Sequence, residues 1–252
     1  MFNKDLKKIY DAIYRKGEKR HYSKNLFSQS APLQVMEPLK ELNWKGKDVL
    51  DVGCGTGLFS HLVKGKGAKK VTGVDYSKEA IALAKKKYGE EGIEFLCEDF
   101  TKIRGKYDAV VSLGTFEHLD NPLSTLKHFK GLLKKNGSII IVSPNWTNPR
   151  GYALLTLYYL FNAKITLADR HYLTPIEFIG WSKAIGMKLN FRTFDYDWGF
   201  GEKMIKDFKR RLPRVLPGNR NVKKFIAWLK NHVPSVETPS KFNGALGLYR
   251  FR

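Results

Sequence analysis

A cluster of glycines marks the part of the chain best suited to binding a ligand. Gly53, Gly55 and Gly57 follow directly after the apolar run VLDV and precede a helical pattern that begins near Leu58. Glycines suit such a turn because a ligand can approach the backbone more closely than a Cβ permits, and because tight turns can require positive φ. A dinucleotide fingerprint would place its third glycine at position 58, which is leucine here. The spacing therefore indicates a different kind of nucleotide ligand.

Three aspartates lie at the ends of successive apolar runs. Asp51 precedes the glycines, Asp75 ends the second run and Asp99 follows the third. A carboxylate at Asp51 would repel a pyrophosphate but could pair with the ammonium of an amino-acid tail. Asp75 could accept hydrogen bonds from both ribose hydroxyls, and Asp99 could accept one from an adenine amino group while Phe100 flanks the ring. This row of carboxylates favours S-adenosylmethionine, a nucleoside with a sulfonium and an amino-acid tail.

Candidate groups for proton transfer follow the fourth apolar run. Glu117 and His118 are expected at the rim of the site that faces the methyl group of S-adenosylmethionine. His171 is expected to reach the same site from the segment after the fifth run. A histidine titrates near neutrality and can take a proton from a phenol or hydroxyl. We predict His118 or His171 as the base for an acceptor that has a proton to lose. In the alternative interpretation, Glu117 braces the loop and His118 is a packing residue.

Alternating apolar runs and helical patterns predict the elements that must position these groups. This alternation is typical of a parallel sheet built from βαβ units. The predicted strands are 47–52, 70–75, 93–97, 107–113 and 138–143, followed by 189–196 and 246–251, and the predicted helices are 59–64, 78–88 and 122–133. An apolar stretch at 151–168 is predicted as a lid helix, because it is interrupted by polar residues and too short for a membrane span.

Two segments depart from a minimal domain. Residues 1–45 are predicted as an N-terminal helical cover, and residues 46–252 as one domain with a helical insertion at 197–243 between its last two strands. Apolar residues in the insertion recur with helical spacing, which predicts two basic amphipathic helices. The two apolar faces consist of Met204, Ile205, Phe208 and Leu212, and of Val222, Phe225, Ile226 and Leu229. The lid contributes an aromatic set that could wall a planar acceptor, namely Trp146, Tyr152, Tyr158, Tyr159 and Phe161.

The charge of the chain is concentrated away from the glycine cluster. The formal net charge is +21, and residues 202–232 alone hold ten basic and two acidic side chains. Three interpretations of this basic insertion stay open: a solvated cap, contact with an anionic membrane surface, or nucleic-acid binding, which ranks last because no RNA-binding module accompanies it. Two widely spaced cysteines and the lack of a signal peptide favour a cytoplasmic protein, free or peripheral to a membrane.

The ordered motifs resemble those of class I S-adenosylmethionine-dependent methyltransferases over roughly residues 45–190. They are VLDVGCGTG, GVDYS, EDF, YDAVVSLGTFEHLDNP and LLKKNGSIIIVSPN. FEHLDNP and a later HYLTP segment are most similar to the group that contains the ubiquinone-biosynthesis O-methyltransferases. The resemblance implies an α/β, Rossmann-like, seven-stranded and mostly parallel sheet with helices on both faces and an antiparallel last strand. It implies cofactor contacts from Asp51, Gly53, Cys54, Gly55, Gly57, Asp75, Tyr76, Asp99, Phe100 and Leu113.

The same group typically carries an E-x-x-E-H motif able to hold a divalent cation. Here Gly114 replaces the first glutamate, so only Glu117 and His118 remain and no metal site is predicted. We therefore predict a methyltransferase that acts on an oxygen of a small or lipid-like acceptor and releases S-adenosylhomocysteine. Nitrogen, carbon and protein acceptors stay open, as do an RNA methyltransferase and a non-catalytic protein that binds S-adenosylmethionine. The sequence carries no signal for an oligomeric state.

Overall fold

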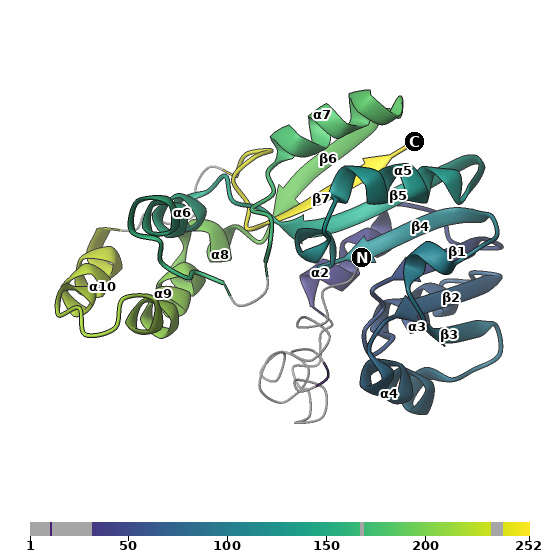
Figure 1. Ribbon diagram of the computed structural model, residues 1–252, viewed down its shortest axis with the longest axis horizontal. Coiled ribbons are helices and arrows are strands. Elements are labelled where there is room, and N and C mark those ends of the chain that lie inside the picture. The colour runs from purple at the N-terminus through teal and green to yellow at the C-terminus, as the bar shows by residue number, and fades with distance from the viewer. Residues whose placement is uncertain (1–10, 12–31, 167–168, 233–238) are drawn as a thin grey trace.

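A seven-stranded sheet forms the centre of the molecule (Figure 1). The computed structural model describes residues 11, 32–166, 169–232 and 239–252, so the predicted N-terminal cover lies mostly outside the described residues. The strands are β1 (Asp48–Val52), β2 (Lys70–Asp75), β3 (Ile93–Cys97), β4 (Tyr107–Leu113), β5 (Leu133–Pro144), β6 (Leu189–Phe194) and β7 (Leu246–Phe251). Their order is β3-β2-β1-β4-β5-β7-β6, with parallel pairing from β3 to β5 and β7 antiparallel to both neighbours. The predicted Rossmann-like fold is confirmed.

Helices bury both faces of this sheet. Successive residues of a strand point to opposite faces, so Val49 and Val111 pack in one core while Leu50 and Val110 pack in the other. Phe59 of α3 belongs to the first core. The helices and 3-10 turns outside the insertion are α2 (Leu33–Met36), η2 (Pro38–Lys40), α3 (Leu58–Gly65), α4 (Lys78–Tyr88), η3 (Phe100–Lys102), η4 (Phe116–His118), α5 (Pro122–Gly131), α6 (Pro149–Phe161) and α7 (Pro175–Ile185).

Several predicted boundaries are wrong. The lid helix predicted at 151–168 ends at Phe161, because Asn162 has a φ of 50°. The helix predicted at 122–133 ends at Gly131, and β5 starts earlier than predicted because Leu133 already pairs with Tyr107, ahead of a register shift. The strand predicted to reach residue 196 ends at Phe194, because Asp195 has a φ of 57° and leaves the extended conformation. The short helix α8 (Tyr196–Phe200) begins there.

Four helices form a second packed unit, which we call the cap: α6, α8, α9 (Glu202–Val215) and α10 (Asn221–His232). Figure 1 shows them together on the side of the molecule away from β3. The predicted apolar face of α9 is buried in a separate core with Trp146, Leu154 and Ile165. On α10, Ile226 and Leu229 are buried as predicted, but Phe225 is 39% exposed. In the described part of the chain, no helix is long and apolar enough to cross a bilayer.

Candidate functional site

The glycine cluster forms a tight turn at the carboxyl end of β1. Gly53, Gly55 and Gly57 all have positive φ, of 75°, 52° and 83°, a conformation that side chains with a Cβ rarely adopt. A Cβ on Gly53 would collide with the side chain of Thr115, and one on Gly57 would lie 2.6 Å from the ring of Phe95. The turn therefore needs glycine at these positions, for its own geometry as well as for a ligand.

Two buried carboxylates flank this turn. Asp51 is 2% exposed and accepts a hydrogen bond from Ser60 Oγ at 2.7 Å. Asp75 accepts from the amides of Gly55 at 3.0 Å and Ser77 at 2.9 Å, so it holds the glycine turn against the end of β2. Burial raises the pKa of Asp51 to about 7, with a further contribution from the charge of Asp75, and burial raises the pKa of Asp75 to about 6.

The charge of this pair fits a cationic ligand. Within the described ranges, no lysine or arginine forms an ion pair with Asp51 or Asp75. Opposite charge nearby favours the ionised form of a carboxylate, and burial opposes it. S-adenosylmethionine brings a sulfonium and an ammonium, and could supply the compensating positive charge that the protein does not.

Cofactor affinity is expected to fall on acidification from roughly pH 7.5 to pH 6. A cation binds best to ionised carboxylates, but the raised pKa values of Asp51 and Asp75 mean that part of the free protein carries protons there. Binding must then release these protons, so the dissociation constant should rise on the order of tenfold at the lower pH. Calorimetry in two buffers of different ionisation enthalpy measures the released protons. A pH-independent affinity without proton release would contradict the assignment.

The third predicted carboxylate, Asp99, caps a short helix of the protein. Asp99 Oδ1 accepts from the amide of Thr101 at 2.9 Å and from its hydroxyl at 2.8 Å, which caps η3. Phe100 is buried and its ring lies 5.7 Å from that of Phe129, edge to face. Contacts of Asp99 and Phe100 with adenine stay predictions.

The other predicted cofactor residues lie at the same edge of the sheet. Cys54 follows Gly53 in the turn, and burial together with the charges of Asp51 and Asp75 raises the pKa of its thiol. Tyr76 directly follows β2, where burial raises the pKa of its hydroxyl. Leu113 ends β4 beside Val142 of β5. The predicted residues therefore surround the carboxyl ends of the strands, where ligands bind in open α/β sheets.

Glu117 lies at the centre of the predicted acid-base group. It is 4% exposed, and Ser143 Oγ donates to its Oε2 at 3.3 Å. Its backbone carbonyl accepts from the amides of Arg170 at 2.9 Å and His171 at 3.1 Å. Burial, and then the charge of Asp169, raises the pKa of Glu117 to about 8. Glu117 thus braces a segment more than 50 residues further along the chain.

The two predicted histidines, His118 and His171, both lie close to Glu117. His118 Nδ1 is 3.5 Å from Asp169 Oδ1, and its Nε2 is 4.0 Å from Glu117 Oε1. His171 Nε2 is 2.8 Å from the carbonyl of Leu119, so this nitrogen carries the proton and donates it. Nδ1 is then the basic nitrogen of a neutral His171. The structure brings all three predicted acid-base residues together.

Asp169 adds a third potential metal ligand that the sequence analysis did not consider. Glu117, His118 and Asp169 offer ligand atoms that all lie within 4.8 Å of one another, so they could hold a divalent cation. A Cβ on Gly114 would lie 3.9 Å from Glu117 Oε1. A side chain at position 114 would therefore reach this cluster, but here the additional carboxylate comes from a distant segment.

Sequence reasoning missed several residues that support the site. Ser60 lies in the first turn of α3 and Ser77 directly before α4, and serines near helix starts are a usable signal for such roles. Asp11 accepts from Ser77 Oγ at 2.7 Å, and its charge acts on Asp75. Asp169 carries no local signal, because only the fold places it beside His118.

Comparison with known proteins agrees with this geometry. A family model described as a methyltransferase domain matches residues 50–141. A ubiquinone biosynthesis O-methyltransferase of Pseudomonas paraeruginosa is 30% identical over 179 residues, which are 64% of this chain and 76% of the relative. One from Coxiella burnetii is 31% identical over 173 residues, covering 63% of this chain and 73% of the relative.

Solved structures share the fold. A methyltransferase from Thiobacillus denitrificans in complex with S-adenosylhomocysteine is 19% identical, with a TM-score of 0.56 over 100% of this chain and 98% of the other. The magnesium protoporphyrin IX methyltransferase of Synechocystis PCC 6803 is also 19% identical, with a TM-score of 0.56 over 73% of this chain and 90% of the other. Together with the motif order and the buried carboxylates, these similarities identify the cofactor as S-adenosylmethionine and the activity as methyl transfer. The chain belongs to the class I S-adenosylmethionine-dependent methyltransferases.

Proposed function

We propose that this methyltransferase acts on an oxygen of a small or lipid-like acceptor. The observation that carries the proposal is the acid-base group beyond β4, where His118 lies between the carboxylates of Glu117 and Asp169. A hydroxyl or phenol must lose its proton when it is methylated, whereas many other acceptors need no base. The names of the two bacterial relatives, which describe O-methyltransferases, support the same acceptor atom.

The site has two sides: one would bind the cofactor, and the other would take a proton from the acceptor. S-adenosylmethionine supplies an electrophilic methyl group when bound. At the glycine turn, Asp51 would pair with its ammonium group, and Asp75 would accept hydrogen bonds from its ribose hydroxyls. Asp169 orients His118 through its Nδ1, and Nε2 of the same ring takes the proton of the acceptor. Most of the acceleration then comes from holding the acceptor oxygen in line with the methyl carbon.

Turnover with an acceptor library tests this proposal. The purified protein is incubated with labelled S-adenosylmethionine and with phenols, hydroxylated quinone precursors, lipids, amines, proteins and RNA. We expect label on an oxygen of a phenolic or lipid-like compound. Transfer to RNA, with a steep dependence on salt, would indicate an RNA methyltransferase instead. Cofactor binding without transfer to any of these would support a non-catalytic interaction protein.

We also propose that the cap contacts an anionic membrane surface. Tyr159, Leu160 and Phe161 at the end of α6 are 69%, 72% and 66% exposed, and Trp228 on α10 is 54% exposed. Monomeric soluble proteins seldom expose such groups of apolar side chains. Trp228 is stacked with Phe225, so α10 presents an aromatic surface.

Basic side chains accompany these exposed aromatics. Lys224 lies one turn before Trp228 on α10, and both are exposed. Lys209 of α9 is close enough to Lys230 of α10 for that charge, together with Lys206, to lower its pKa. Aromatic and aliphatic groups beside crowded lysines are typical of helices that lie on anionic lipid. Exposed Leu160 favours lipid over RNA, because an aliphatic side chain offers no stacking surface to a base.

Removing the apolar group at the end of α6 is expected to weaken vesicle binding roughly tenfold or more, since each side chain loses its burial in lipid. The variant changes Tyr159, Leu160 and Phe161 to serine, and flotation with phosphatidylcholine vesicles, with and without phosphatidylglycerol, measures binding. Ile176→Ser is the matched control, because Ile176 is 66% exposed on α7, outside the cap. Equal binding of the parent protein to neutral and anionic vesicles, no binding at all, or preferential binding to RNA would refute the membrane proposal.

A further inference from the structure

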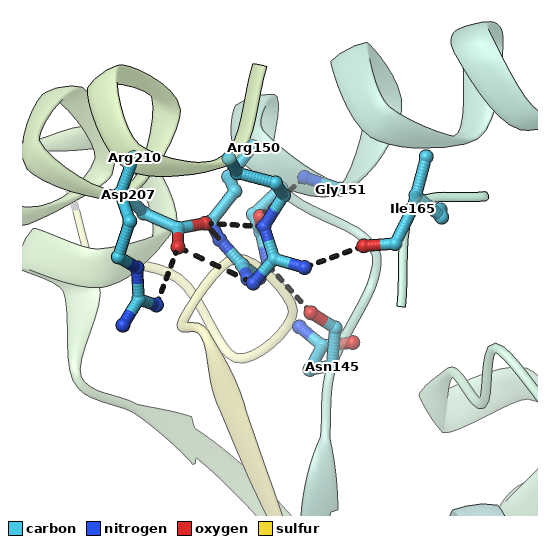
Figure 2. Close-up of polar contacts among 8 residues, drawn as sticks. Asn145, Arg150, Gly151, Ile165, Asp207 and Arg210 are labelled. Atoms are coloured by element: carbon cyan, nitrogen blue, oxygen red, sulfur yellow. Dashed lines mark hydrogen bonds and ion pairs between the residues drawn. The ribbon is translucent and has the colours of Figure 1, made fainter. Parts of the chain in front are cut away.

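A buried carboxylate in the insertion gathers three arginines. Asp207 of α9 has a fully buried side chain, and Figure 2 shows the arginines around it. Its Oδ2 accepts from Arg150 Nε at 2.8 Å and from Arg211 Nε at 3.0 Å. Its Oδ1 accepts from Arg210 Nη2 at 3.1 Å and from Arg211 Nη2 at 3.2 Å. A buried carboxylate with two buried or half-buried arginines fixes their side chains, because none of the charges can be left unpaired at low cost.

The two inner arginines extend from Asp207 to one segment of the chain, of which the structure describes residues 163–166 and 169–172. Arg211 Nη1 donates to the carbonyl of Ile165, and Figure 2 marks a bond to the labelled Ile165 with a dashed line. Arg150 lies over the ring of Trp146, 5.8 Å from its centroid. The ring of Tyr172 in turn packs edge to face against Trp146, with centroids 4.8 Å apart. Asp207 therefore supports this segment at two points, near its beginning and at its end.

Between these two points, the same segment forms one wall of the acid-base group. Asp169 faces His118 at 3.5 Å. The amides of Arg170 and His171 donate to the carbonyl of Glu117, and the His171 ring donates to the carbonyl of Leu119. The positive charges of Arg211 and Arg150 also act on the Asp169 carboxylate. The described residues of this segment thus contact the cap arginines at Ile165 and the candidate catalytic residues at Asp169 and His171.

We propose that Asp207 is a positioning residue for the acceptor side of the site: through Arg211 and Arg150 it fixes the segment that holds Asp169 and His171 against Glu117 and His118. The consequence for catalysis rests on the proposed function of that group. The positional claim itself does not, because it concerns only where the segment lies. The insertion then supports the site through a buried residue, Asp207, although most of its other charged residues are basic and exposed.

Hydrogen exchange tests the positional claim without any acceptor. In Asp207→Asn, one amide oxygen can still accept from an arginine, but the amide NH₂ faces the second guanidinium. We expect the Arg170 and His171 amides to lose at least roughly tenfold in protection, since their bonds to Glu117 would open more often. Arg210→Ala is the matched control: Arg210 bonds the same carboxylate but is 63% exposed and has no bond to Ile165. Its exchange at these two amides should stay unchanged.

The outcomes separate positioning from a general loss of stability. Faster exchange confined to α9, with Arg170 and His171 as protected as in the parent, would overturn the proposal. If Asp207→Asn does not fold, Arg211→Lys replaces it, because lysine keeps the charge but lacks the planar fork of donors with which Arg211 holds both Asp207 and the Ile165 carbonyl. Unchanged protection of the two amides in this variant would equally overturn the proposal.

Steady-state kinetics with the acceptor identified from the library tests the consequence for catalysis. Asp207→Asn should lower kcat at least about tenfold while the dissociation constant of S-adenosylmethionine stays within twofold, because the cofactor carboxylates come from β1 and β2. Lost protection without an effect on kcat would refute the catalytic role of the group and leave the positional claim intact. An equal loss of cofactor affinity would show that Asp207 acts on the whole fold, and would overturn the proposal.

Discussion

Replacing His118 with asparagine is expected to lower kcat by roughly 10²–10⁴, the usual contribution of a positioned general base. Asparagine keeps a hydrogen-bonding group near Asp169 but cannot take a proton from the acceptor. His118 is the better candidate of the two histidines because its Nδ1 faces a carboxylate, 3.5 Å away, that stabilises the protonated ring. Steady-state rates with the acceptor identified from the library measure the effect.

Two comparisons make the His118 result specific. His61→Asn is the matched control, because His61 is an exposed histidine that also pairs with an acid, Glu90, outside the acid-base group. It should leave kcat unchanged. The dissociation constant of S-adenosylmethionine should not change in His118→Asn. A full loss in His171→Asn with an active His118→Asn would assign the base to His171 instead.

Asp75→Ala should raise the dissociation constant of S-adenosylmethionine more than about tenfold. A hydrogen bond to a charged group contributes about 1.5–3 kcal/mol, and 1.4 kcal/mol corresponds to a factor of about ten. The structure adds a second reason, since Asp75 also accepts from the Gly55 and Ser77 amides and so holds the turn that we predict to bind the cofactor. Isothermal titration calorimetry measures the affinity directly.

A second variant distinguishes these two contributions of Asp75. In Asp75→Asn the amide oxygen can still accept from Gly55, so the turn is kept while the negative charge is lost. Its affinity should lie between those of the parent and of Asp75→Ala. Glu94→Gln, which removes an exposed acid from the neighbouring strand β3, should bind normally. Unchanged affinity in Asp75→Ala would exclude the ribose contact.

Several elements of the fold could be predicted from local pattern alone. The helix at 78–88 and the strand at 246–251 have the predicted bounds, and the Ser77 cap fixes the start of the helix. Asp51, Gly53 and Asp75 follow their strands directly, so a correct sheet is enough to bring them together. The sequence therefore predicted where these residues lie, at the carboxyl ends of β1 and β2, and their contacts with the cofactor stay predictions.

The acceptor side could not be predicted in the same way, because long-range packing assembles it. Asp169 lies 52 residues beyond Glu117 and has no motif of its own. Asp207 stands among lysines and arginines, a pattern that predicts a solvated surface. Only the packing of α6 against α9 shows that this acid is buried and that Arg150, 57 residues earlier, compensates it.

The chain leaves the sheet after Phe194 and returns at Leu246, and these two residues are paired neighbours on β6 and β7. A loop whose ends are already held side by side can change length at small entropic cost, about 0.6 kcal/mol for each doubling. The length of the connection between β6 and β7 can thus change while the sheet that carries the glycine turn keeps its pairing.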